Sequence, residues 1–149
     1  MSLYRRNQIR RLARKSLGFA GQMHYTEGPG RRELFHRPKG AFSGAGADCS
    51  QYSASLLHWI GVRGVTDQDF TGTLCTKGRK ITKPQRGAFV FFGAPPYVHM
   101  GVLVKPLTAP SWHVIGFGDQ QAPDENTLPG MLEFFRAQGH PGHEFRDLT

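Results

Sequence analysis

The stretch "GAGADCSQYSASLLHWIG", Gly44 to Gly61, places a cysteine between a glycine-rich lead-in and a segment with helical spacing. Gly61 is a residue at which helices commonly end, and Asp48 is a good N-cap residue. The sequence therefore predicts a helix over about Asp48–Trp59, with Cys49 in its first turn. The side chains that give this helical spacing are Tyr52, Ser53, Leu56, Leu57 and Ile60.

Cys49 has four roles to choose from: core filling, half of a disulfide, a metal ligand or a nucleophile. Cys49 and Cys75 are the only cysteines, too few for a disulfide framework or a cysteine-rich zinc site. At the start of a helix, unpaired N–H groups and the positive end of the helix dipole stabilise the reactive thiolate. The position therefore favours a nucleophile. Cys75, in "GTLCTKG", lies outside any predicted helix start and is expected to be an inert, partly buried thiol.

The rest of the chain predicts an α+β architecture in a single domain over residues 1–149. A helix is expected over about residues 3–20, and a short strand near Ile81. Three apolar runs then predict a meander of strands: Gly87–Gly93, His99–Lys105 and Ser111–Gly118. Weaker patterns predict a short helix within residues 129–139 and an edge strand within residues 143–148.

The composition is that of a globular chain, with 38% hydrophobic and 20% charged residues. The net charge of +8 points to a polyanion: nucleic acid, an anionic membrane or an anionic cell wall. The predicted N-terminal helix carries much of this charge, either as a basic face for an anionic surface or as an ordinary solvated face. Its basic residues include Arg5, Arg10, Arg11, Arg14 and Lys15.

The same charges interrupt the N-terminal segment, so it lacks the apolar region of a secretory signal. No apolar run approaches the roughly 20 residues of a membrane span. We therefore expect a protein that is made in a cytoplasm and has no membrane span.

A cysteine nucleophile needs a base, which in cysteine hydrolases is a histidine distant in the sequence and close in space. The chain has seven histidines. His99 opens a predicted strand directly after "GAPPYV", where a side chain at the rim of a cleft is natural. The alternative for His99 is an ordinary hydrogen-bonded surface residue. Together with Cys49 at a helix start, His99 is the best candidate for the base.

Three motifs in order resemble the NlpC-type cell-wall cysteine peptidases, a papain-like superfamily: "DCSQYSASLLHWIG", "QRGAFVFFG" and "VHMGVLV". That family carries Asp-Cys-Ser at a helix start, a strand of the type Gly-Asp-Leu-Val-Phe-Phe, and His-Val-Gly-Ile at the next strand. The segments "HYTEGPGRR", "DFTGTL" and "VIGFGDQQAP" further resemble the branch found in bacteriophage lysins and virion-associated wall hydrolases. The similarity covers about residues 25–123. It implies a papain-like fold, with the catalytic cysteine at a helix N-terminus packed on an antiparallel sheet.

Matched position by position, the resemblance makes Cys49 the nucleophile and His99 the base. Tyr25 matches a tyrosine that lines the family's site near the thiol. Asp48 and Ser50 flank the nucleophile in the same motif and are expected to contribute to substrate binding.

The chain departs from the family pattern at three positions. Gln51 stands where glycine usually follows Cys-Ser, and Ala88 replaces the usual acidic residue of the strand. Phe117 stands where the phage-type pattern often carries a histidine. The identity of the third catalytic residue is therefore open.

The third residue should hold the base in the right tautomer, which requires an acceptor near its remote ring nitrogen. His113, across a hairpin from the predicted strand of His99, is the first choice, and Asp119 is the second. In the alternative interpretation, Trp112 and His113 simply cover the sheet.

The resemblance implies hydrolysis of an amide bond in the peptide stem of peptidoglycan, through an acyl-enzyme on Cys49 and without a metal or other cofactor. The partner would be the bacterial cell wall, and no nucleic acid is expected. The protein would act on the wall after release from the host cytoplasm or as part of a virion; its oligomeric state is open. Two alternatives remain: a basic module that binds wall polymer or nucleic acid and has a decayed site, and an amidase or transferase chemistry on the same scaffold.

Overall fold

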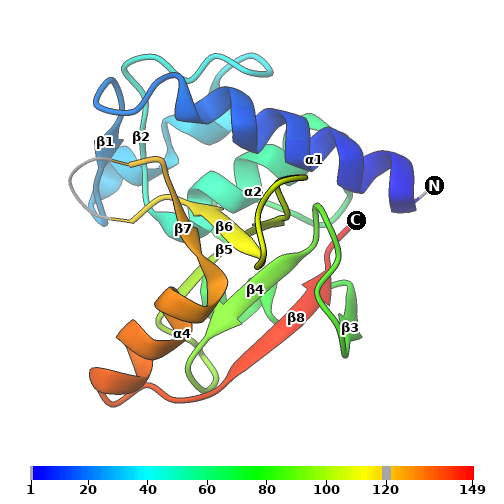
Figure 1. Ribbon diagram of the computed structural model, residues 1–149. Helices are drawn as coiled ribbons and strands as arrows, with labels where there is room; N and C mark the ends of the chain where they lie inside the picture. The colour runs from blue at the N-terminus through cyan, green and yellow to red at the C-terminus, as the bar shows by residue number, and fades with distance from the viewer. Residues whose placement is uncertain (1, 119–121) are drawn as a thin grey trace.

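The computed structural model describes residues 2–118 and 122–149 and confirms the predicted α+β class. Helices pack on a six-stranded antiparallel sheet with strand order β3-β8-β4-β5-β6-β7 (Figure 1). The helices are α1 (Ser2–Leu17), α2 (Cys49–Trp59), α3 (Thr71–Leu74) and α4 (Leu128–Ala137). The strands of this sheet are β3 (Arg79–Ile81), β4 (Phe89–Phe92), β5 (His99–Val104), β6 (His113–Gly116), β7 (Asp124–Thr127) and β8 (His143–Asp147).

The segment between α1 and α2 is less regular than the rest of the fold. It holds a parallel pair of very short strands, β1 (His24–Tyr25) and β2 (Gly46–Ala47). Between them lie the 3₁₀ turns η1 (Pro29–Arg32) and η2 (Leu34–His36). The parallel pair joins the segment before η1 directly to the residues that lead into α2, so β2 brings Tyr25 close to the start of that helix.

The start and end of α2 agree with the sequence prediction. Asp48 is the N-cap, and its side chain accepts a hydrogen bond from the Gln51 backbone N–H. The helix ends before Gly61, whose positive φ of 83° suits a residue without a Cβ. Cys49 is therefore the first residue of α2, as expected.

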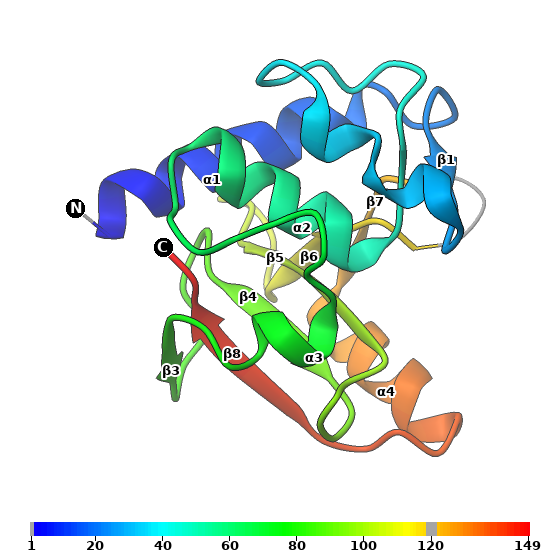
Figure 2. The same ribbon diagram turned by 180° about the vertical axis from the view of Figure 1, so that it is seen from behind.

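The sheet separates two layers of packing (Figures 1 and 2). The main core lies between the sheet and the pair α1 and α2, and the second core lies between the sheet and α4. Alternation along β4 divides its side chains between them: Phe89 and Phe91 enter the main core, whereas Val90 and Phe92 enter the second. Neighbouring residues of β4 thus pack in different cores, one on each side of the sheet.

Helix α1 is part of this packing. Ile9, Leu12 and Ala13 are buried in the main core, and the Ser16 hydroxyl lies 2.7 Å from the buried Tyr52 hydroxyl. The backbone of α1 also approaches the residues before β4, because a Cβ on Gly87 would clash with the Arg6 carbonyl oxygen. The helix is thus built into the molecule rather than attached to its surface.

The strand predictions are confirmed for β3, β4, β5 and β6, and the predicted short helix is α4. The predicted edge strand near the C-terminus exists as β8, but its edge position is wrong. β8 lies between β3 and β4 and pairs with both. The edge strands are β3 and β7, and the sequence of β7, "DENT", has no apolar residue to indicate a strand. In the described ranges, no helix has the length and apolar character needed to cross a membrane.

Candidate functional site

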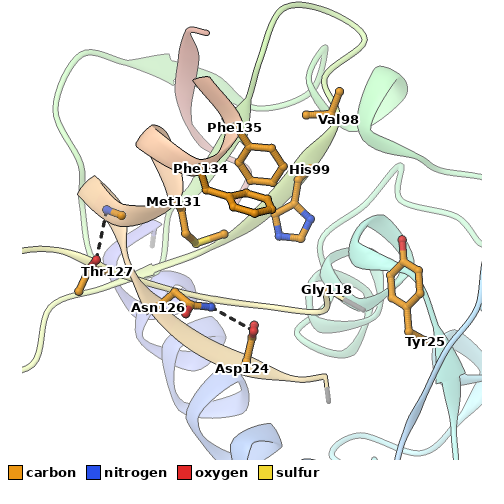
Figure 3. A pocket seen from close by; sticks show the side chains of 11 residues that line it. Tyr25, Val98, His99, Gly118, Asp124, Asn126, Thr127, Met131, Phe134 and Phe135 are labelled. Carbon is orange, nitrogen blue, oxygen red and sulfur yellow. Dashed lines mark hydrogen bonds between the residues drawn. The ribbon is translucent and has the colours of Figure 1, made fainter. Parts of the chain in front are cut away.

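A cavity of about 580 Å³ lies on the α4 side of the sheet (Figure 3). Its apolar wall comes from α4 and includes Met131, Phe134 and Phe135. Asp124 and Asn126 of β7 line another side, with the Asn126 amide donating to the Asp124 carboxylate at 3.0 Å. The cavity is therefore amphipathic, with an aromatic wall and a polar wall.

His99 and Tyr25, both predicted as site residues, line this cavity. Figure 3 shows the His99 ring beside the α4 aromatic side chains and Tyr25 on the far side of the cavity from α4. Gly118 contributes to the lining, and a Cβ on Gly116 would lie 3.3 Å from His99 Nε2. Small residues on β6 and just after it thus leave room beside the imidazole.

His99 is held by aromatic packing. Its ring stacks on Phe92 at a centroid distance of 5.9 Å and on Phe135 at 5.6 Å. Burial lowers the pKa of His99 to about 4, because an apolar environment disfavours the charged imidazolium. At neutral pH the ring is therefore uncharged, as a general base must be before it accepts a proton.

Cys49 lies in the main core, with 8% of its surface exposed. Its sulfur is hydrogen-bonded by backbone N–H groups of Ser50 and Met100, which lower the thiol pKa. Burial and then the Asp48 carboxylate raise it more, and the net result is a pKa of about 12. In this state Cys49 is a protonated thiol with two backbone donors already directed at the sulfur.

Tyr25 connects the cavity with the thiol. It stacks on Phe117 at a centroid distance of 6.0 Å, and its hydroxyl donates to Glu27 at 3.0 Å. Burial raises the pKa of the Tyr25 hydroxyl, and the charge of an ionised Cys49 raises it further. The structure places Tyr25 where its hydroxyl pKa responds to the charge of Cys49 and where the residue lines the cavity; its role in substrate binding stays a prediction.

The structure places the Cys49 and His99 side chains on opposite faces of β5. His99 pairs with Phe92 and packs with α4, whereas the next residue, Met100, faces the main core with Cys49. No hydrogen bond joins the thiol to the imidazole, although both residues are within the described ranges. Cys49 and His99 therefore do not form a preformed side-chain pair, and the backbone of β5 lies between their side chains.

Asp48 and Ser50, expected to bind substrate, do not line the cavity. The Asp48 carboxylate accepts from Arg31 Nε at 2.7 Å and from the Ser50 hydroxyl at 2.9 Å. Arg31 Nη2 also donates to the Asp69 backbone carbonyl at 2.9 Å. These side chains are directed into an internal network at the start of α2, and the expectation that they contact substrate stays a prediction.

The proposed third residue, His113, is on the strand next to β5 but at the wrong end. The register pairs it with Val104, at the opposite end of β5 from His99. Its Nδ1 lies 2.7 Å from Glu125 Oε2, and Glu125 also bonds Arg14 of α1 at 3.5 Å. His113 thus joins α1 to the sheet and does not reach the His99 ring. The second choice, Asp119, lies outside the described residues.

The positions that depart from the family pattern are buried. Gln51 is fully buried, and its amide donates to the Asp69 carbonyl at 2.9 Å, away from the cavity. Phe117 lies in the main core and stacks on Tyr25 and Tyr52. Where a polar third residue was expected, an aromatic ring therefore supports Tyr25.

Sequence reasoning missed the α4 aromatic wall, the β7 polar wall and the Arg31 contact with Asp48. Arg31 lies in the segment "HYTEGPGRR", which by itself does not indicate a partner at the α2 cap. Within the described ranges, no three His, Cys, Asp or Glu residues gather in a way that could hold a metal ion. No family model matches the chain, and a search of curated proteins gave no match.

Proposed function

We propose that the protein is a cysteine hydrolase that cleaves an amide bond in the peptide stem of bacterial peptidoglycan. The observation that carries the proposal is the Cys49 sulfur at the first turn of α2, held by the Ser50 and Met100 N–H groups. Tyr25, whose hydroxyl pKa responds to the charge of Cys49, and His99 both line an amphipathic cavity, and Cys49 itself is not among the residues that line it. The choice of peptidoglycan rests on the sequence resemblance and on the net charge of +8, which suits an anionic wall.

In the proposed reaction, His99 takes the thiol proton and the Cys49 sulfur attacks the amide carbon. The backbone N–H of Cys49, at the N-terminus of α2, stabilises the negative oxygen of the tetrahedral intermediate. The C–N bond breaks, and the imidazolium returns the proton to the leaving amine. Water then hydrolyses the thioester, releasing the acid and restoring the thiol.

The described state is a neutral resting state in this scheme, because the thiol pKa is raised and the imidazole pKa is lowered. Ionising the pair requires the imidazole to approach the thiol, and catalytic hydrogen bonds commonly tighten only when substrate binds. His99 is the first residue of β5, so a change of its backbone disturbs few of the hydrogen bonds between strands, and a change of its rotamer disturbs none of them. Substrate in the cavity is the expected trigger for this approach.

The test of the proposal uses purified bacterial cell walls, with loss of turbidity and release of new amino groups as measurements. Cys49→Ala is expected to lower the rate by more than about 10³-fold, because no nucleophile remains. Cys75→Ala is the matched control and is expected to keep full activity, since its thiol bonds only the Gly72 carbonyl within the described chain. Iodoacetamide should abolish activity and EDTA should not. Full lysis by Cys49→Ala, or loss on chelation alone, would disprove the proposal.

A second test concerns the base. His99→Ala is expected to lower the rate by about 10²–10⁴-fold, the usual contribution of general acid–base catalysis. His113→Ala is the control, because His113 bonds Glu125 and lies at the other end of β5. Equal losses in the two variants would reject the assignment of His99 and return His113 to the site. Wall binding without cleavage by the unmodified protein would favour the decayed binding module instead.

A further inference from the structure

The start of α2 holds an ion pair that is nearly closed to water. Arg31 and Asp48 lie 2.7 Å apart, with 12% and 13% of their side-chain surfaces exposed. Arg31 comes from η1, 17 residues before Asp48, and its Nη2 reaches the Asp69 carbonyl and, at 3.4 Å, the Ser50 hydroxyl. The guanidinium is thus bonded to three residues from two parts of the chain, the start of α2 and Asp69, and one of them is the residue before Cys49.

Asp48 has two opposed effects on its neighbour. As the N-cap it orders the first turn of α2, through bonds to the Gln51 N–H and the Ser50 hydroxyl. As a carboxylate beside the sulfur, its negative charge opposes ionisation of Cys49. The Asp48 side chain that orders the first turn of α2 therefore also carries a negative charge that destabilises the Cys49 thiolate.

Other ionisable groups act on the same sulfur but do not remove this conflict. Glu27 adds a second negative charge, and Tyr25 is a neutral phenol at ordinary pH because its pKa is raised. His99 is on the other face of β5 and is uncharged at neutral pH. Arg31 is the cation bonded directly to the Asp48 carboxylate.

We propose that Arg31 is a positioning residue that fixes the Asp48 cap and compensates its charge, so that Cys49 can be ionised. At short range in a water-poor site, a compensating charge shifts the pKa of a nearby acidic group by about one unit or more. A role of Arg31 in catalysis rests on the proposed function. Its effect on the reactivity of the Cys49 thiol is independent of that function.

The test measures the rate of Cys49 alkylation by iodoacetamide between pH 6 and 10, in a Cys75→Ala background so that one thiol is observed. Below the thiol pKa, the rate is proportional to the thiolate fraction, so one unit of pKa is tenfold in rate. Arg31→Met is expected to lower the rate about tenfold at each pH. Asp48→Asn keeps a capping oxygen, removes the negative charge, and is expected to raise the rate.

The double variant Arg31→Met/Asp48→Asn is expected to recover at least the rate of the Cys75→Ala background, because no carboxylate remains to be compensated. Arg31→Lys, which keeps the charge, should stay within a few-fold of that rate. Arg32→Met is the matched control: this neighbour bonds the Asp67 carbonyl and Gln68 rather than Asp48. Thermal unfolding of each variant verifies that the folded protein is being alkylated.

An unchanged alkylation rate in folded Arg31→Met would overturn the inference. So would a double variant that is as slow as Arg31→Met, because the loss would then not act through Asp48. If Arg31→Met does not fold, Asp48→Asn decides: a rate that does not rise rejects the charge conflict. If Cys49→Ala still cleaves cell walls while the alkylation series behaves as expected, the proposed function fails and the role of Arg31 stands.

Discussion

At the scale of single residues, the packing of His99 makes the stability of the fold depend on pH. The unfolded chain binds a proton at this histidine below about pH 6.5, whereas the folded chain does so only below about pH 4. In that window the unfolded state binds more protons, so the free energy of unfolding falls as the pH falls. The shift corresponds to about 3 kcal/mol lost between pH 6.5 and pH 4.

This residue-scale prediction is checked by urea unfolding at several pH values, with His99→Phe as the comparison. Phenylalanine keeps an aromatic ring between Phe92 and Phe135 but does not titrate. The difference in unfolding free energy between the two proteins should shift by about 3 kcal/mol in favour of the variant on going from pH 7 to pH 4. A difference that stays constant with pH would show that His99 is not buried as a neutral ring.

At the scale of elements, the charge of α1 is divided between internal and external uses. Arg6 pairs with Asp147 at 3.5 Å, Arg14 with Glu125 at 3.5 Å, and Arg5 donates to the Thr149 backbone oxygen. Arg11 and Lys15 are the exposed basic side chains of the helix. The external part of the basic face is therefore smaller than the sequence suggests.

If this external part attracts the protein to anionic walls, Arg11→Gln/Lys15→Gln should weaken wall binding several-fold at low salt and little at high salt. The variant should cleave a small soluble peptide at an unchanged rate. Arg63→Gln/Lys83→Gln, which removes the same charge from exposed positions outside α1, is the control. Equal weakening in both pairs, measured by cosedimentation with cell walls, would assign the effect to net charge rather than to α1.

At the scale of the whole molecule, α1 is expected to be indispensable for folding. Deleting residues 1–17 would uncover the main core where Ile9, Leu12 and Ala13 pack, and would leave the Tyr52 hydroxyl without the Ser16 hydroxyl. The loss of this buried apolar surface would lower the free energy of unfolding by several kcal/mol, which is comparable to the whole stability of a small domain. Circular dichroism and thermal unfolding check this: a truncated chain with a cooperative transition would make α1 an accessory arm.

The extent to which sequence predicts this molecule follows from the range of each interaction. Local patterns set α2, its Asp48 cap and the apolar strands, and all of these were predicted. The position of β8 depends on pairing with β3 and β4, far away in the chain, and β7 lacks the apolar residues that mark a strand. A local sequence pattern does not predict pairing between strands that are far apart in the chain.

The candidate site shows the same limit. Cys49, Tyr25 and His99 could be named from their motifs, but the motif does not say which face of β5 the His99 ring takes. That choice depends on the aromatic side chains of α4, and Phe135, on which the ring stacks, follows His99 by 36 residues (135 − 99). The ion pair of Arg31 with Asp48 likewise joins segments that no sequence spacing connects.

One peptide group links the two candidate catalytic residues. The N–H that hydrogen-bonds to the Cys49 sulfur belongs to Met100, and the carbonyl of that same planar unit belongs to His99. A backbone shift at His99 would therefore also move the N–H that faces the sulfur. Such a shift would change a hydrogen bond that lowers the thiol pKa, on the face of β5 opposite the His99 ring.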